Sequence, residues 1–175
     1  MAWFKKARKP LAAPEKTSRV PEGLWEKCPE CDSIIYTKDL VRNLHVCEKC
    51  GHHFRIGAVD RLKALFGHER WEELSPDLRS NDPLTFTDTK PYRERLEKTR
   101  ASTGQSDAVI VGVGRLDGLE TVIASMDYSF IGGSMGVVVG EKIVQGIELA
   151  IERRASVIIV SCSGGARMME GALSL

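Results

Sequence analysis

The sequence predicts an α/β protein in two parts: a small four-cysteine zinc ribbon, followed by a layered α/β domain. Two cysteine pairs, each with the spacing CxxC, indicate the ribbon. From residue 107 onward, apolar runs typical of strands alternate with one long helical pattern, in the order β, β, α, β. A length of 175 residues suits one ordinary domain, or a small module joined to part of a larger one.

Residues 1–24 are expected to form a basic, flexible arm. The arm and the three residues after it carry an excess of basic side chains over acidic ones and hold Pro10, Pro14 and Pro21. The basic side chains are Lys5, Lys6, Arg8, Lys9, Lys16, Arg19 and Lys27. Over the whole chain, 25 Lys and Arg residues balance 24 Asp and Glu residues, so no global field indicates nucleic acid or membrane. No secretory signal and no apolar run of about 20 residues is present, so we expect a cytoplasmic protein without a membrane partner.

Residues 25–57 are expected to form the zinc ribbon. Two CxxC pairs can place four thiolates around one structural Zn²⁺, each sulfur about 2.3 Å from the metal. The predicted ligands are Cys28, Cys31, Cys47 and Cys50. The stretches IIYT, NLHV and HHFRI are predicted to be short strands, and the nearby histidines are expected at the surface or behind the ligands. A redox dithiol is the alternative, whereas catalytic zinc is disfavoured because four protein ligands leave no open position.

Residues 58–104 are expected to connect the two parts. The apolar spacing over 59–66 predicts a helix that Gly67 ends, and HERWEEL is expected to add a short turn. The proline-rich stretch 75–91 is predicted to be a loop. YRERLEKTRAST is then predicted to be a second helix, which Gly104 ends. The aromatic residues Trp25, Trp71 and Tyr92 are expected to pack rather than to stack on a ligand.

Residues 105–175 carry the main domain. We expect strands over 107–116 and 119–128, joined by a tight turn at Asp117-Gly118. EKIVQGIELAIERRA predicts a helix that is buried on more than one face. The almost wholly apolar stretch 156–163 predicts a strand that is covered on both faces.

Two glycine clusters are the candidate chemical site. Gly164 and Gly165 stand between the last strand and an expected helix, where backbone N–H groups can stabilise a developing oxyanion. The cluster Gly132-Gly133-Ser134-Met135-Gly136 repeats the arrangement before the preceding helix. Tight turning between strand and helix is the alternative explanation for each cluster.

Several common sites are absent from the sequence. Neither GxxxxGK[ST] nor GxGxxG occurs, which disfavours nucleotide triphosphates and Rossmann dinucleotides as ligands. No histidine follows His68, so Ser134, Ser161 and Ser163 lack a histidine activator. Cys162 lies in an apolar strand and is expected to be a core thiol.

Taken together, these segments resemble the β subunit of bacterial acetyl-coenzyme A carboxylase carboxyltransferase from about Pro21 onward. The resemblance is carried by PEGLWEKCPEC, RNLHVCEKCGHH, DAVIVGVGRL, FIGGSMGVVVGEKI and SGGARMMEG. Departures are small: that family commonly has Ala in place of Cys162 and Gln in place of Met169. Neither difference changes a backbone donor.

The resemblance implies a crotonase-like fold that transfers a carboxyl group from carboxybiotin, on a biotin carboxyl carrier protein, to acetyl-CoA to give malonyl-CoA. It further implies that the biotin ureido anion removes the acetyl proton and that an α subunit completes the site, in an assembly of two α and two β subunits. By resemblance, the N–H groups of Gly164 and Gly165 would stabilise the enolate, and residues 132–136 would shape the acyl-CoA site. Arg167 would lie near a CoA phosphate, or would form a structural salt bridge.

Members of that family continue for roughly another hundred residues. We therefore expect residues 105–175 to be the N-terminal part of a crotonase-like domain, and the chain alone to be inactive. The alternatives are a regulatory zinc-ribbon protein that binds RNA through the ribbon and the basic arm, and a related acyl-CoA carboxyltransferase or decarboxylase with another substrate.

Overall fold

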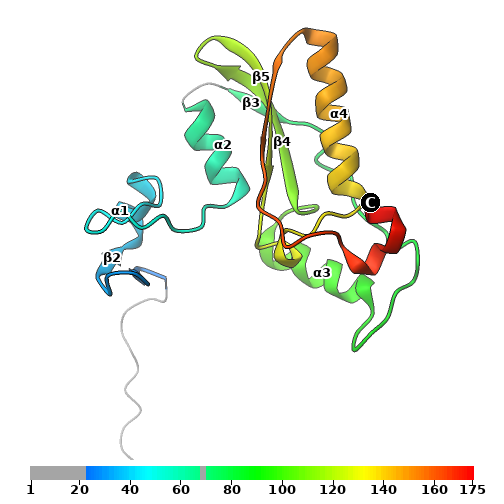
Figure 1. Cartoon of the computed structure of the whole chain (residues 1–175), viewed down its shortest axis with the longest axis horizontal. Helices are drawn as coiled ribbons and strands as arrows, with labels where there is room; N and C mark the ends of the chain where they lie inside the picture. Colours follow the sequence, from blue (N-terminus) through cyan, green and yellow to red (C-terminus); the bar gives the residue numbers. More distant parts are fainter. Residues whose placement is uncertain (1–22, 68–69) are drawn as a thin grey trace, which may run out of the picture. The chain divides into compact units, whose positions relative to one another are not determined.

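The computed structural model describes residues 23–67 and 70–175, which divide into two compact units between Phe54 and Arg55 (Figure 1). The expected basic arm, residues 1–24, falls almost entirely outside the described residues. No helix in the described ranges is both long enough and apolar enough to cross a membrane.

The first unit is built around its two cysteine pairs. Strand β1 (Trp25–Lys27) pairs antiparallel with β2 (Ile34–Tyr36), and the first pair lies in the turn between them. Helix α1 (Thr37–Arg42) follows, although the sequence did not predict it. Of the other two expected strands, only a single bridge between Val46 and His53 forms, around the second pair.

The second unit contains a four-stranded sheet in the order β3-β4-β5-β6. Strands β4 (Val109–Leu116) and β5 (Leu119–Met126) form the predicted hairpin, and Asp117 and Gly118 both have positive φ at its turn. Strand β3 (Trp71–Glu73) pairs antiparallel with β4, whereas β6 (Ser156–Val160) pairs parallel with β5. The expected turn in HERWEEL is therefore wrong for its described part, because Trp71–Glu73 extends the sheet instead.

Successive side chains of β4 and β5 point to opposite faces of the sheet, so each face carries its own hydrophobic cluster. Helix α2 (Ala58–Phe66) packs on one face against Ile110 and Ile123. Helix α4 (Val137–Arg153) lies on the other face (Figure 1), where its residues pack with alternate residues of both strands. That cluster includes Val109, Val111, Val122, Ala124, Val139 and Ala150.

The two predicted helices of the connector are confirmed, and both belong to the second unit. Helix α2 ends at Gly67, and α3 (Tyr92–Thr103) ends at Gly104, where each glycine has positive φ. Asp127 joins α2 to the end of β5, because its carboxylate accepts a hydrogen bond from the N–H of Ala58 at 2.8 Å. A carboxylate at this position satisfies a free N–H and complements the positive end of the helix dipole.

Two expectations about burial are wrong. Strand β6 is an edge strand of the sheet and leaves Val157 and Ile159 exposed, so it is not covered on both faces. Helix α4 buries one face only, since Val144 and Ile151 on its other side are exposed. A run of apolar residues in the sequence does not show whether the strand or helix it forms is covered on one face or on both.

Candidate functional site at two glycine loops

The structure brings the two predicted glycine clusters together. Because β5 and β6 are parallel neighbours, the chain leaves both at the same edge of the sheet. The N–H of Gly164 donates to the carbonyl of Gly132 at 2.9 Å, and the N–H of Met135 donates to the carbonyl of Gly165 at 2.9 Å. The N–H of Arg167 then donates to the carbonyl of Met135 at 2.8 Å. We call residues 132–136 the first glycine loop and residues 163–167 the second.

The loops lie too close for side chains at two positions of the first loop. A Cβ atom added to Gly133 would lie 2.1 Å from the carbonyl oxygen of Cys162, and Gly133 has φ +66°. A Cβ at Gly136 would lie 2.6 Å from a carboxylate oxygen of Glu170. Glycine is therefore required at position 133, where the first loop passes the backbone just before the second loop, and at position 136, where it passes the side chain of Glu170, whatever the loops bind.

The predicted oxyanion donors already have partners within the chain. The Gly164 N–H is bonded to Gly132, whereas the Gly165 N–H donates only to the hydroxyl of Ser163 at 3.0 Å, on an exposed residue. The expected helix directly after the glycines is wrong, because a 3₁₀ helix, η2 (Met168–Ser174), begins three residues after Gly165. The role of Gly164 and Gly165 as oxyanion donors remains a prediction.

Arg167 forms the structural ion pair, which was one of its two expected roles. Its side chain has no exposed surface, and its two terminal nitrogens donate to the carboxylate of Asp107 at 2.6 and 3.1 Å. Nε donates to the hydroxyl of Ser134 at 3.0 Å, and Nη2 donates to the Ser134 carbonyl at 2.7 Å. Burial alone would lower the pKa of Arg167, but the hydrogen bonds and charge of Asp107 raise it. The guanidinium offers no surface to a CoA phosphate in this structure.

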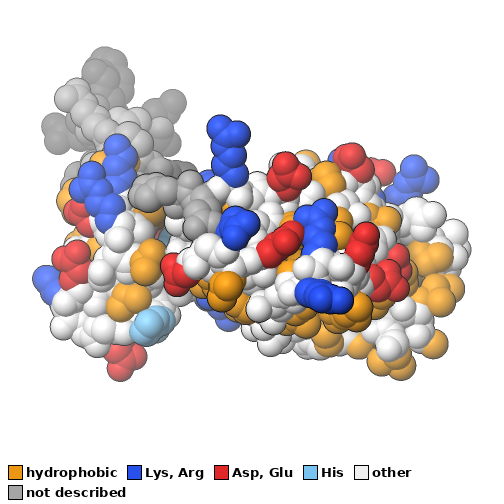
Figure 2. Space-filling view, turned by 90° about the horizontal axis from the view of Figure 1, so that it is seen from above, with side chains coloured by type: hydrophobic (Ala, Val, Ile, Leu, Met, Phe, Trp, Pro, Cys, Tyr) orange, Lys and Arg blue, Asp and Glu red, His pale blue; other side chains and the backbone are white. Residues whose placement is uncertain are grey.

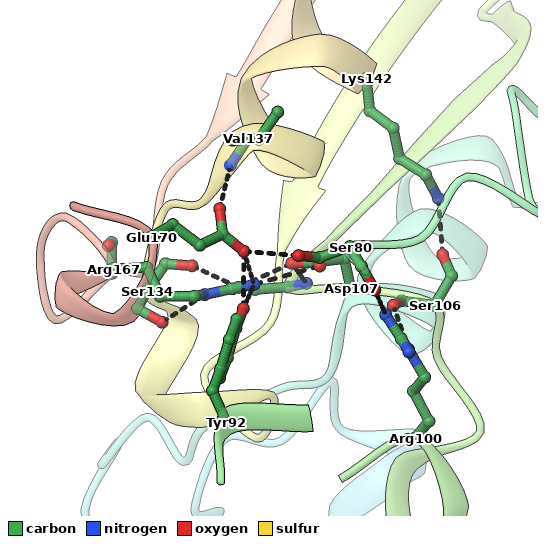
Figure 3. A network of polar contacts seen from close by, with 12 residues as sticks. Ser80, Tyr92, Arg100, Ser106, Asp107, Ser134, Val137, Lys142, Arg167 and Glu170 are labelled. Atoms are coloured by element: carbon green, nitrogen blue, oxygen red, sulfur yellow. Dashed lines mark hydrogen bonds and ion pairs between the residues drawn. The ribbon is translucent and has the colours of Figure 1, made fainter. Parts of the chain in front are cut away.

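Glu170 is a residue with several hydrogen-bond partners that the sequence did not predict (Figure 3). One carboxylate oxygen accepts from the hydroxyls of Tyr92, at 2.6 Å, and Ser80, at 2.7 Å, and lies 3.5 Å from Nη1 of Arg167. The other accepts from the N–H of Val137, the first residue of α4, at 2.6 Å. The start of α4 is thus capped by a side chain of the same protein.

The protonation of this group follows from its partners. Burial acts to raise the pKa of Glu170, but the hydrogen bonds from Tyr92, Val137 and Ser80 lower it overall. Burial, together with the hydrogen bond to Glu170, raises the pKa of Tyr92. The carboxylate is therefore ionised and the phenol neutral, so the phenol is the donor in their hydrogen bond.

The remaining residues of the two loops are more accessible. Met135 is exposed and Ser134 is half-buried, and Met168, directly after the second loop, is exposed as well. Cys162 is half-buried and packs against the main core, in agreement with a packing thiol.

The four predicted zinc ligands lie together in the first unit. The sulfurs of Cys28, Cys31, Cys47 and Cys50 all lie within 4.8 Å of one another. Two of the sulfur–sulfur distances are 3.6 and 3.8 Å. Four thiolates around Zn²⁺ at about 2.3 Å would stand about 3.8 Å apart, so the cysteines fit a closed, structural zinc site.

Local hydrogen bonds prepare this site for a metal. The hydroxyl and backbone N–H of Ser33 stabilise the thiolate of Cys31 and lower its pKa to about 6. The N–H of Gly51 donates to the carbonyl of Cys47 at 2.8 Å, which closes the turn of the second pair. The lowered pKa of Cys31 favours the deprotonated form that binds metal. At Cys50 the backbone hydrogen bond of His52 acts to lower the pKa, but burial and the neighbouring cysteines raise it to about 12.

The described residues do not favour a nucleic-acid interface. In the first unit, Lys27 and Arg42 pair with Asp32 and Asp39. On the face drawn in Figure 2, basic and acidic side chains are interspersed over the second unit. The basic arm, which was the main reason for the RNA alternative, lies outside the described residues.

Comparison with protein families gives two matches. Residues 78–175 match the model of the carboxyl transferase domain, and residues 25–50 match that of the acetyl-CoA carboxylase zinc finger domain.

Curated relatives named acetyl-coenzyme A carboxylase carboxyl transferase subunit beta are similar along the whole chain. The relative from Pedobacter heparinus is 46% identical over 100% of this chain and 63% of its own length. The relative from Citrifermentans bemidjiense is 49% identical over 100% and 62%. The chain thus spans about three fifths of the length of these relatives.

Solved structures show the same similarity. A 12S transcarboxylase crystal structure with methylmalonyl-coenzyme A and methylmalonic acid bound has a TM-score of 0.54 and 26% identity. The match covers 69% of this chain and 21% of that one. A Pseudomonas malonate decarboxylase hetero-tetramer in complex with malonate has a TM-score of 0.50 and 28% identity, over 78% of this chain and 46% of that one. The predicted fold class, a zinc ribbon followed by an α/β carboxyltransferase domain, is confirmed.

Proposed function

The chain belongs to the carboxyl transferase domain family, with the acetyl-CoA carboxylase zinc finger ahead of that domain, and from this premise we propose its activity. It acts in the carboxyltransferase component of acetyl-CoA carboxylase, as the β subunit. The substrates are carboxybiotin, held on a biotin carboxyl carrier protein, and acetyl-CoA, and the product is malonyl-CoA. An α subunit is the expected partner.

The observation that carries this proposal is the pairing of the two glycine loops at the ends of β5 and β6. Backbone groups dominate the surface that these loops can offer, because the charged side chains nearby, such as Arg167 and Glu170, are buried. The sequence holds no histidine after His68. The site is therefore suited to reactions in which the protein positions its substrates and stabilises negative charge, without supplying a histidine base.

The proposed reaction needs these properties. The C–N bond of carboxybiotin breaks and releases CO₂, and the resulting ureido anion takes a proton from the methyl group of acetyl-CoA. The enolate carbon then forms a new C–C bond to CO₂, which gives malonyl-CoA. In this proposal the N–H groups of Gly164 and Gly165 stabilise the thioester oxygen as it becomes an enolate, and the Gly164 N–H shares its bond to the Gly132 carbonyl with the substrate oxygen. The Gly165 N–H exchanges its bond to Ser163 for the substrate oxygen.

The test is the reverse reaction, in which malonyl-CoA transfers its carboxyl group to a free biotin derivative. It uses the natural gene product together with its α subunit. Valine keeps the backbone N–H, but its side chain crowds the carbonyl of Gly132 at position 164 and strains the backbone at position 165, where φ is +116°. Because both changes misdirect the donors, we expect Gly164→Val and Gly165→Val to lower kcat by about 100-fold or more, as loss of an oxyanion donor does. Gly140→Ala is the matched control, because a Cβ at this exposed position of α4 meets nothing within 4 Å.

The substrate is tested in the same assay. Full activity of both glycine variants would contradict the proposed role of the second glycine loop. Methylmalonyl-CoA as a better carboxyl donor than malonyl-CoA would indicate a related acyl-CoA carboxyltransferase. Absence of transfer from any acyl-CoA by a complete pair of subunits would reject the carboxyltransferase activity.

A further inference from the structure

Four polar side chains, one of them from the second glycine loop, form a completely buried cluster (Figure 3). We call this set the anchoring cluster: Tyr92, Asp107, Arg167 and Glu170. They come from α3, from the segment before β4, and from the chain around the start of η2. Burying three charges in one place is costly unless each is paired, so a cluster of this kind calls for an explanation beyond packing.

The cluster bonds to Ser134 of the first glycine loop and to Val137, the residue that directly follows this loop. Arg167 donates to the carbonyl and the hydroxyl of Ser134, and Glu170 accepts from the N–H of Val137. Donor and acceptor thus hold residues 134–137 from one side. Met135, between these points, bonds to the second loop: its N–H donates to the carbonyl of Gly165, and its carbonyl accepts from the N–H of Arg167. The path of the first loop is therefore fixed at successive residues.

The charges of the cluster also favour this arrangement. Two carboxylates face one guanidinium, which leaves an excess of one negative charge among the buried side chains. The positive end of the α4 dipole lies against Glu170 and offsets part of that excess. Arg100 donates to the backbone carbonyls of Ser80, at 2.7 Å, and Ser106, at 3.2 Å, directly beside the cluster. Without the carboxylate of Glu170, the N–H of Val137 and the hydroxyls of Tyr92 and Ser80 lose their common charged acceptor, which weakens the hold on the start of α4 and on the first loop.

We propose that Glu170, supported by Tyr92, is a positioning residue for the reaction: it fixes the first glycine loop so that both loops present one rigid backbone surface to the acyl-CoA. It touches no substrate, because its carboxylate is buried and its hydrogen bonds go to protein groups. The kinetic part of this inference rests on the proposed carboxyltransferase function, whereas the anchoring of the loop does not.

The first measurement is amide hydrogen exchange in Glu170→Gln and Tyr92→Phe. The first variant keeps the size of the side chain and removes its charge, and the second removes one hydroxyl and leaves the ring in the core. We expect exchange at 134–138 to become about tenfold faster or more in both variants, with smaller changes along β4 and β5. The control is Lys142→Met, which removes an ion pair between a buried lysine and the partly exposed Glu73, together with a hydrogen bond to the hydroxyl of Ser106. These partners of Lys142 lie outside the two glycine loops.

The second measurement is malonyl-CoA-dependent carboxylation of a biotin derivative by the full subunit with its α subunit. We expect kcat to fall about tenfold or more in Glu170→Gln at an unchanged folded fraction, since displaced loops misalign the substrate. In Lys142→Met, stability falls but kcat per folded molecule stays at the wild-type value. Unchanged exchange at 134–138 in Glu170→Gln, or equal loss of kcat in the control, would overturn the inference. A wild-type pair without transfer activity would reject the proposed function, and the exchange data would still decide the anchoring.

Discussion

A single methyl group at Gly133 tests how closely the two glycine loops must approach. In Gly133→Ala, the new Cβ would lie 2.1 Å from the Cys162 carbonyl, at a residue with φ +66°. The clash and the left-handed backbone together should lower the free energy of unfolding by about 3 kcal/mol or more. Urea unfolding of the variant, compared with wild type, measures this loss.

The control for this change lies a few residues further along. Gly140→Ala places a methyl group in open space on the exposed side of α4, where alanine is the better helix former. It should raise the free energy of unfolding by about 0.5–1 kcal/mol. Equal effects of the two substitutions would show that the close approach of the loops contributes nothing to stability.

Asp127 makes the stability of the second unit depend on pH. Burial acts to raise the pKa of this carboxyl, but hydrogen bonds from Ser129, Ala58 and Gln105 lower it overall. When the pKa of a carboxyl is lower in the folded protein than in the unfolded chain, its ionised form stabilises the fold. This contribution is fully present at a pH above the unfolded-chain pKa, about 3.9, and is lost as the pH falls through the pKa of the folded protein. Asp127→Asn should therefore cost about 1–2 kcal/mol near neutral pH.

The pH profile separates charge from packing. The difference in unfolding free energy between wild type and Asp127→Asn should be constant near neutral pH and should shrink below about pH 4. Chemical denaturation of both proteins at a series of pH values measures this difference. Any effect of pH on the zinc ribbon is the same in both proteins and cancels in the difference. A difference that persists unchanged into strong acid would show that the charge of Asp127 is not involved.

Individual residues differ in how far the sequence could reveal their roles. The zinc ligands were predictable because CxxC spacing fixes the geometry locally, and the structure confirms their grouping. Glu170, Asp107 and Tyr92 were not predictable, because their contacts join residues distant in sequence and no local pattern marks them. Arg167 was identified with two possible roles, and only the tertiary fold showed the buried ion pair.

Among the helices and strands, those whose conformation is determined by residues close together in the sequence were predicted correctly. Helices α2 and α3, with glycines at their ends, and the hairpin turn at Asp117-Gly118 follow from periodicity and turn chemistry. Strand β3 was missed because Trp71–Glu73 alternates too briefly to show a period, and pairing with β4 decides its conformation. The exposure of β6 could not be read from its composition, because burial depends on its place at the edge of the sheet.

Strand β6 is an exposed edge that should promote self-association of this 175-residue chain. Its outer backbone groups are unpaired by any described strand, and Ile159 is 46% exposed. A charged side chain on an edge strand opposes pairing with another copy. Ile159→Lys should reduce the associated fraction in concentrated solution while changing the free energy of unfolding by no more than about 0.5 kcal/mol.

Analytical ultracentrifugation over a concentration series measures this effect. Leu119→Lys is the control, since it adds the same charge at an exposed position at the start of β5, a strand that is already paired on both sides and is not itself the edge. If both variants associate less to the same degree, net charge is responsible rather than the edge.

At the scale of the whole molecule, the two compact units should lose structure separately. In the described part of the first unit, only Cys28, Leu40 and Cys47 are buried core residues, which is too little for a stable core without a metal. A strong chelator should therefore unfold residues 25–54 and leave residues 55–175 folded. Two-dimensional NMR of the labelled chain, before and after chelation, follows both units at once.

Cysteine variants provide the matched comparison for the metal. Cys47→Ser should lower the bound zinc well below one per chain, whereas Cys162→Ser, in the second unit, should leave it unchanged. Retained signal dispersion of residues 25–54 after complete zinc removal would contradict a structural role for the metal.

The parallel pairing of β5 with β6 also bears on the order in which the protein folds. The β4–β5 hairpin closes through a two-residue turn, so it can form early and quickly. Strand β6 reaches β5 only after the chain has passed through the whole of α4, and this closure costs more chain entropy. The two glycine loops meet only when β6 has docked. We expect the proposed site to be the last region to form on refolding, in the same step that completes the native state.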